Sequence, residues 1–391
     1  MLSASGLIDK ARQSTGLHDL GDHSFREGLD VVVRTACASA GLNDLGWQIL
    51  EAHCLMLLSN RLKIEHWYTL HPEIDEQEIV APLIGLGLPR TGSTALGCML
   101  AEDPDARSLR MWEAFLPCPP PEKATYNMDP RIAEMAKVMD YADRLYPRMK
   151  VMLPFSPTAI AECQNLMGLD FKCQEFLTKS CCPDYADWLL YEADLVPTYR
   201  YMKRALKLLQ WRCPGRQWRL KSPSHMPFIE ALDQVFPDAR FWMTHRDIAK
   251  ALPSVADIYY EMLLPSTNEA AGQYAIDVNM KWWVVGLQRV MAFRDGGGDD
   301  RFIDIQFLEF RNNPEASIEK IYAFLGQELT EETRARMEEW RRTSSSEPSG
   351  DRNYSVVING IDPSQVRERF KFYTDRYLES QAALQTRAPL Y

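Results

Sequence analysis

The chain lacks the features that mark membrane, secreted and zinc-binding proteins. No stretch of eighteen consecutive apolar residues occurs, and the first residues contain no apolar segment of a signal peptide. The nine cysteines include the adjacent pair Cys181-Cys182 but no C-x-x-C motif. We therefore expect reduced, mostly buried thiols, no metal site and no stable membrane insertion, in a cytoplasmic protein.

Positive charge is also scarce. The chain has 44 Lys and Arg residues against 54 Asp and Glu residues, which gives a net charge of −10. This balance argues against a nucleic-acid partner, so any bound anion must be held by a local group of cations and helix N-termini. A hydrophobic content of 46% and a charged content of 25% are typical of a globular enzyme. Nothing in the composition indicates an oligomeric state.

The pattern of apolar residues predicts an α/β fold. Residues 1–75 show helical spacing and are expected to form a helical N-terminal region packed on the core. Within residues 76–391, four short apolar runs near 79–87, 217–221, 239–245 and 301–305 alternate with helical patterns. This alternation predicts an open parallel β-sheet of the P-loop type, flanked by helices. Residues 107–215 are expected to form a helical insertion that binds the acceptor.

A glycine-containing turn follows the first predicted strand. Gly87 and Gly92 have the spacing of a P-loop, but Ser93 stands where a nucleotide triphosphatase carries lysine, and the cation comes earlier, as Arg90. A turn that leads into a helix N-terminus directs several backbone N–H groups at one point, which suits a phosphate.

Two further motifs follow predicted strands. Lys221 ends the strand near 217–221, and His225 comes four residues later. Arg246 follows the next strand, with Ser254 eight residues beyond it. The carboxyl ends of parallel strands share one edge of a sheet, where such folds bind ligands. An arginine and a hydroxyl at that edge can converge on one anionic group.

Together, these three motifs resemble those of sulfotransferases that use 3′-phosphoadenosine-5′-phosphosulfate (PAPS), in the bacterial branch related to tyrosylprotein sulfotransferases. The resemblance implies that Arg90 and the backbone N–H groups of Thr91, Gly92, Ser93 and Thr94 hold the 5′-phosphate of the phosphosulfate. It also implies that Arg246 and Ser254 hold the 3′-phosphate. Lys221 would stabilise the leaving oxygen of the product, adenosine 3′,5′-bisphosphate, with no metal required. A late basic loop often contacts adenine in this family, and Arg352 is the candidate here.

The general base that takes the proton of the acceptor has two candidates. His225 titrates near neutrality in its ordinary state and lies close to Lys221 in sequence. Glu113 resembles the catalytic glutamate of the tyrosylprotein branch, although an ion pair with Arg107 or Arg110 is an equal interpretation. The sequence leaves the choice between the two bases open.

Methionine and aromatic residues in the insertion, together with Trp282 and Trp283, suggest an adaptable apolar pocket. We therefore expect a small-molecule acceptor, a lipophilic alcohol or phenol. Two alternatives remain open at this stage. One is a P-loop kinase of nucleotides or small molecules, and the other is a non-catalytic protein that binds adenosine 3′,5′-bisphosphate.

Overall fold

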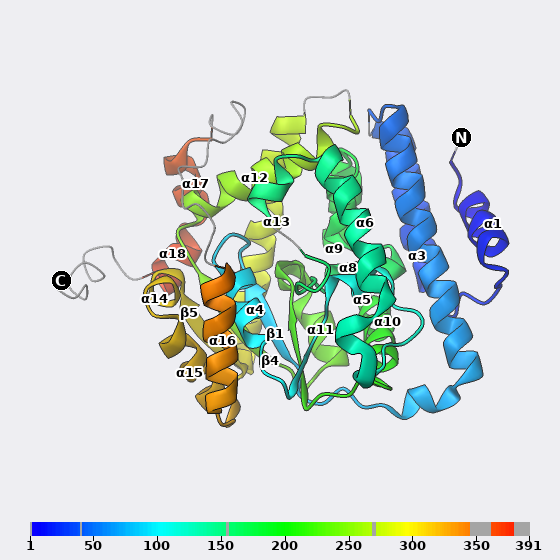
Figure 1. Ribbon diagram of the computed structural model, residues 1–391. Helices are drawn as coiled ribbons and strands as arrows, with labels where there is room; N and C mark the ends of the chain where they lie inside the picture. Colours follow the sequence, from blue (N-terminus) through cyan, green and yellow to red (C-terminus); the bar gives the residue numbers. More distant parts are fainter. Residues whose placement is uncertain (1, 40, 154–155, 268–270, 345–360, 379–391) are drawn as a thin grey trace.

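In the part of the chain that the structure describes, five parallel strands form a central sheet with helices on both faces (Figure 1). The computed structural model describes residues 2–39, 41–153, 156–267, 271–344 and 361–378. Across the sheet, the strands are β2 (Ala106–Ser108), β3 (Gln217–Lys221), β1 (Leu83–Gly87), β4 (Arg240–His245) and β5 (Phe302–Gln306). The predicted α/β fold with an open parallel sheet is confirmed. Only β2 is absent from the prediction, because three residues are too few to show an apolar pattern.

The helices fall into three groups along the chain. The N-terminal group contains α1 (Ala4–Thr15), α2 (Ser24–Ser39) and α3 (Asp44–Leu70). The insertion contains α5 (Met111–Phe115), α6 (Pro130–Leu145), α7 (Met149–Met152), α8 (Gln164–Met167), α9 (Pro183–Tyr191) and α10 (Val196–Gln210). The others are α4 (Ser93–Leu100), α11 (Ile229–Val235), α12 (Ile248–Leu263), α13 (Ala271–Phe293), α14 (Phe307–Asn312), α15 (Pro314–Leu325), α16 (Glu331–Ser344), α17 (Pro363–Arg369) and α18 (Lys371–Tyr377).

Alternate side chains of the central strands enter two different apolar cores. Leu83 of β1 and Trp242 of β4 pack with residues of α4, α14, α15 and α16. Ile84 and Phe241 belong to the larger core on the opposite face. Because both faces are covered, β1 is buried along its whole length, as is usual for parallel sheets. Gly85 makes room for the neighbouring strand, since a Cβ there would lie 2.1 Å from the Trp242 side chain.

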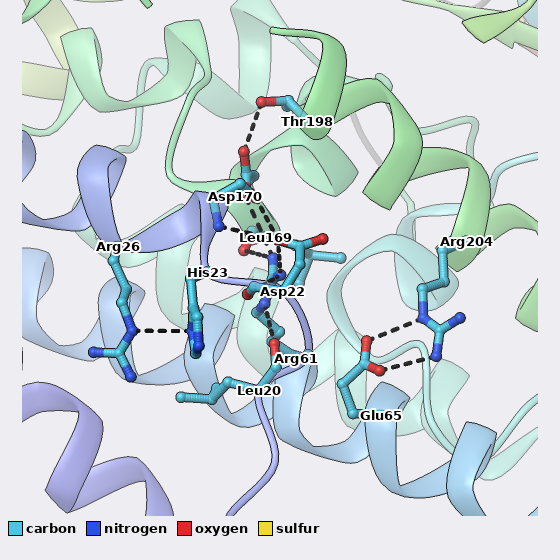
Figure 2. Close-up of polar contacts among 12 residues, drawn as sticks. Leu20, Asp22, His23, Arg26, Arg61, Glu65, Leu169, Asp170, Thr198 and Arg204 are labelled. Carbon is cyan, nitrogen blue, oxygen red and sulfur yellow. Dashed lines mark hydrogen bonds and ion pairs between the residues drawn. The ribbon is translucent and has the colours of Figure 1, made fainter. Parts of the chain in front are cut away.

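A buried arginine joins the N-terminal helices to the insertion (Figure 2). Arg61 of α3 has 0% of its surface exposed. Its guanidinium donates to the carbonyl oxygens of Leu20, at 2.6 Å, and Leu169, at 3.2 Å. It also forms ion pairs with Asp22, at 3.0 Å, and Asp170, at 3.4 Å. One side chain therefore ties together the segment before α2, helix α3 and the segment after α8.

The other partners of this network complete the hydrogen bonding of Asp170. The hydroxyl of Ser24 donates to one carboxylate oxygen. The hydroxyl of Thr198 donates to the other at 2.7 Å (Figure 2). The Arg61 guanidinium also lies over the Tyr201 ring, 3.7 Å from its centroid. Burial raises the pKa of Asp170 above its ordinary value. Since these groups come from both sides of the contact, the N-terminal helices are an integral part of this packing.

Replacement of Arg61 tests how strongly this network holds the N-terminal helices. Arg61→Met should lower the free energy of unfolding by about 3–5 kcal/mol, because it leaves the buried carboxylate of Asp170 without this cation. Arg26→Met is the matched control, since Arg26 makes an exposed hydrogen bond to His23. It should change the free energy by less than about 0.5 kcal/mol. Urea denaturation measures both, and equally small effects would show that the network contributes little.

Candidate functional site

The turn between β1 and α4 has the backbone of an anion-binding loop. Arg90 and Gly92 both have positive φ angles, of 66° and 82°. Gly92 is the N-cap residue of α4, and no side-chain hydrogen bond caps this helix end among the described residues. The N–H groups of its first turn are therefore open to a ligand. Gly92 also fits closely against α14, because a Cβ would lie 3.2 Å from the Phe307 ring.

The side chain of Thr91 holds this loop in shape. Thr91 is 0% exposed, and its hydroxyl donates to the carbonyl oxygen of Leu88 at 2.6 Å. The same hydroxyl lies 2.5 Å from the hydroxyl of Thr244 on β4. The side chain is thus occupied by the protein, and only the backbone N–H of Thr91 is available to an anion.

The loop motif and the Arg246 motif meet at the sheet edge. The guanidinium of Arg246 donates through Nη1 to the carbonyl oxygen of Arg90 at 2.7 Å. In turn, Arg90 Nε donates to the hydroxyl oxygen of Ser254 at 3.0 Å. Ser254 is 4% exposed, in the second turn of α12. Two arginines and a serine from three separate segments therefore lie around one point.

The C-terminal helix α18 supports the strand end that carries Arg246. His245 lies between Asp304, at 2.7 Å from Nε2, and the hydroxyl of Tyr373, at 3.2 Å from Nδ1. Arg294 donates two hydrogen bonds of 2.8 Å to the same aspartate. Burial of Asp304 opposes its ionisation, but hydrogen bonds from Arg294 and His245 hold its pKa below the ordinary value. These contacts fix the direction in which the chain leaves β4.

Lys221 lies between the anion-binding loop and an acidic side chain of the insertion. Its Nζ lies 3.2 Å from the hydroxyl of Thr94 and 2.5 Å from Oε1 of Glu162. The lysine side chain is 5% exposed, whereas that of Glu162 is 29% exposed. The backbone N–H of Cys163 donates to the carbonyl of Lys221 at 3.2 Å and so places this carboxylate. No sequence motif marks Glu162, because it reaches the site only through this long-range contact.

The two candidate bases from the sequence are both inaccessible. His225 is 0% exposed, and its Nδ1 lies 2.9 Å from the hydroxyl of Tyr199. Burial lowers the pKa of His225 to about 3, so the ring is neutral and a weak base.

Glu113, the second candidate, is also 0% exposed. Arg107 forms a bidentate ion pair with its carboxylate, with one of the two hydrogen bonds measuring 3.0 Å. The hydroxyl of Tyr126 and the N–H of Arg110 donate to it as well, at 2.8 Å and 3.1 Å. These contacts match the alternative interpretation of Glu113 as half of an ion pair.

The sequence also predicts an adenine contact by Arg352, no metal site and no stable membrane insertion. Arg352, the candidate for the adenine contact, lies outside the described residues. Among the described residues, no three His, Cys, Asp or Glu side chains are grouped to hold a metal ion. Over the same part of the chain, no helix is both long and apolar enough to span a membrane.

Comparison with known proteins gives concordant matches over most of the chain. The model of the family described as the sulfotransferase family matches residues 82–331. The crystal structure of sulfotransferase STF9 from Mycobacterium avium superposes with a TM-score of 0.88 and 30% identity, over 97% of this chain and 98% of that chain. Sulfotransferase STF1 from Mycobacterium tuberculosis H37Rv gives a TM-score of 0.84 and 27% identity, over 94% and 98%. No curated protein sequence matches. The chain therefore belongs to the sulfotransferase family, and the predicted activity of sulfuryl transfer is confirmed.

Proposed function

We propose that this sulfotransferase takes its sulfuryl group from PAPS and releases adenosine 3′,5′-bisphosphate. The observation that carries the proposal is the contact of Arg246 with the Arg90 carbonyl at 2.7 Å, which brings two anion-binding motifs together. A ligand that carries phosphates at both the 3′ and the 5′ position of one adenosine would bind to both motifs at once. Forked arginine donors and helix N-termini are the groups that suit such phosphates.

We assign the 3′-phosphate to Arg246 and Ser254. Ser254 is 4% exposed and already accepts a hydrogen bond from Arg90 at 3.0 Å. When the donor binds, we expect phosphate oxygens to replace this contact. They would accept hydrogen bonds from both the Ser254 hydroxyl and the Arg246 guanidinium. The 3′-phosphate distinguishes PAPS from ordinary adenine nucleotides, so this pair would supply the selectivity for the donor.

We assign the 5′-phosphosulfate to the open end of α4. The N–H groups of Thr91, Gly92, Ser93 and Thr94 would hold its oxygens, and Arg90 would add a positive charge. Lys221 lies 3.2 Å from the Thr94 hydroxyl and is placed to stabilise the bridging oxygen as it leaves. Because sulfuryl transfer resembles phosphoryl transfer, positioning and charge stabilisation should dominate.

We propose Glu162 as the general base, in place of His225 and Glu113. Its carboxylate is 29% exposed and lies 2.5 Å from Lys221 Nζ, the cation that we assign to the leaving oxygen, which supports a position beside the transferred group. The acceptor hydroxyl would give its proton to a Glu162 oxygen while its own oxygen attacks the sulfur. Both alternative bases are 0% exposed, so an acceptor hydroxyl cannot reach them in this structure.

The donor is tested directly with two labelled compounds. Purified protein is given ³⁵S-labelled PAPS or ATP labelled at the γ-phosphate, each with a panel of alcohols, phenols and glycosides. Transfer of ³⁵S without transfer of phosphate is the expected result. Transfer of phosphate from ATP, or tight binding of PAPS with no transfer to any acceptor, would contradict the proposal.

Arg246→Ala tests the site of the 3′-phosphate. It should weaken binding of adenosine 3′,5′-bisphosphate by roughly 10- to 100-fold, because a charged hydrogen-bond donor is lost. Binding of adenosine 5′-monophosphate should change little, since that ligand has no 3′-phosphate. Isothermal titration calorimetry measures both, and Arg336→Ala on the surface of α16 is the control. An equal loss of affinity for the two nucleotides would show that the 3′-phosphate binds elsewhere.

Glu162→Gln tests the general base. Turnover should fall by about 10²- to 10⁴-fold, which is the usual contribution of a positioned base. Affinity for adenosine 3′,5′-bisphosphate should stay the same, because the amide replaces the carboxylate without loss of volume. Glu230→Gln, on the exposed side of α11, serves as the control and should keep full turnover. Unchanged turnover in Glu162→Gln would exclude this carboxylate as the base.

A further inference from the structure

The proposed base Glu162 lies on a short segment whose backbone is held on both sides. The N–H of Ala161 donates to the carbonyl of Leu109 at 2.8 Å. The N–H of Cys163 donates to the carbonyl of Lys221 at 3.2 Å. These bonds fix the residues before and after the glutamate, but its partly exposed side chain could still adopt several rotamers.

Two different side chains hold the two oxygens of this carboxylate. Lys221 Nζ lies 2.5 Å from Oε1 of Glu162, and the Gln164 amide donates to Oε2 at 3.1 Å. The Ser222 hydroxyl is a more distant donor to Oε2, at 3.5 Å. An ionised carboxylate offers about four lone-pair sites, so these donors leave a site open to an acceptor hydroxyl. Lys221 and Gln164 together therefore set the direction of the carboxylate.

The amide of Gln164 is itself fixed in one orientation. An ionised carboxylate only accepts hydrogen bonds, so the amide nitrogen of Gln164 must face Glu162 and the amide oxygen must face away. That oxygen accepts a hydrogen bond from the Ser224 hydroxyl at 3.2 Å. The same hydroxyl donates to Oε1 of Gln174 at 2.7 Å, in a three-centre arrangement. Ser224 is 1% exposed and Gln174 is 4% exposed, so packing holds both of them in place.

These supporting side chains come from different parts of the chain. Gln164 begins α8, and Gln174 begins a short helical turn of the insertion. Ser224 lies in the short helical turn directly after β3, which ends at Lys221. One segment of the chain therefore places the lysine on one oxygen of Glu162 and supports the amide on the other.

Stability alone does not account for this arrangement. Gln164 keeps part of its surface accessible, so water could satisfy its amide if the contact with Glu162 were lost. Instead, two buried polar side chains order a carboxylate that is itself partly exposed, and burying polar groups has a cost. Supporting contacts of this kind are typical of a functional group that must keep one geometry.

We propose that Gln164, supported by Ser224, is a positioning residue for the general base. The inference rests on the proposed function, because Gln164 acts only through Glu162. Its amide keeps Oε2 in place, so that the carboxylate does not turn both oxygens toward Lys221 and away from the acceptor. A misplacement of about 1 Å can cost about 10²-fold in rate. Loss of this contact should therefore slow turnover and spare the binding of the donor.

Gln164→Met tests this role, because methionine is similar in length but donates no hydrogen bond. With the best acceptor for ³⁵S-labelled PAPS, kcat should fall by about 10- to 100-fold. KM for the acceptor and the affinity for adenosine 3′,5′-bisphosphate should change little. A merely structural role would reduce the fraction of protein that binds the bisphosphate, but not kcat per binding site. An unchanged kcat per binding site would overturn the proposal.

Gln273→Met on α13 is the matched control. The Gln273 amide also donates to a carboxylate, that of Asp277 at 2.9 Å, but at an exposed position outside the site. Its loss should leave kcat, KM and bisphosphate affinity unchanged. If the control lowers kcat as much as Gln164→Met does, the loss does not come from the base, and the proposal is refuted.

A double variant shows whether Gln164 acts through Glu162. Gln164→Met should not lower turnover further in a Glu162→Gln background, because the base that it positions is already absent. Losses that multiply would give the amide an independent role and refute the proposal. Full turnover in Glu162→Gln alone would refute the base assignment and this inference with it. Slow turnover in Glu162→Gln beside full turnover in Gln164→Met would refute the positioning role alone.

Crystal structures of wild type and Gln164→Met, each with bound adenosine 3′,5′-bisphosphate, give a measurement that needs no acceptor. We expect the Glu162 carboxylate of the variant to be rotated from its position in the wild type, while Ser224 and the backbone of the segment stay in place. A carboxylate in the same position in both structures would contradict the proposal.

Discussion

The hydrogen bond from the Arg246 guanidinium to the Arg90 carbonyl is the contact on which the proposed donor site depends. The two residues are 156 positions apart in the chain, and the distance from Arg246 Nη1 to the Arg90 carbonyl oxygen is 2.7 Å. They meet because β1 and β4 are neighbours in a parallel sheet, with Gly87 opposite Thr244 at their carboxyl ends. Gly87 has a φ of 104°, and a Cβ there would lie 2.7 Å from the Thr244 carbonyl oxygen, so the two strand ends can approach only with glycine at this position.

The sequence was sufficient to predict that the segments of the proposed donor site lie at strand ends and meet at one edge of the sheet. Buried parallel strands have a local apolar pattern, and the loop around Arg90 and the pair Arg246 and Ser254 each occupy a short segment beside one strand. Parallel topology then brings such segments to one edge without further information. This explains why the fold and the convergence of the segments with Arg90 and Arg246 could be predicted from the residues alone.

The proposed base could not be predicted in this way. Glu162 belongs to the insertion and reaches Lys221 only through the backbone bond from Cys163, which no local pattern encodes. His225 is near Lys221 in sequence, but the short helical turn at Pro223–Phe228 directs its ring into the core beside Tyr199. Side-chain direction after a strand end depends on tertiary packing, so proximity in sequence misleads there. The N-terminal helix α3 shows the same dependence, because the buried partner of Arg61, Asp170, lies in the insertion.

A crystal structure with bound adenosine 3′,5′-bisphosphate tests the central claim most directly. The account predicts one molecule across the sheet edge, with its 3′-phosphate on Arg246 and Ser254 and its 5′-phosphate on the N–H groups at the start of α4. The Arg90 side chain should then leave its hydrogen bond of 3.0 Å to Ser254 and contact phosphate. A nucleotide that uses only one of the two motifs, or that binds away from this edge, would contradict the account.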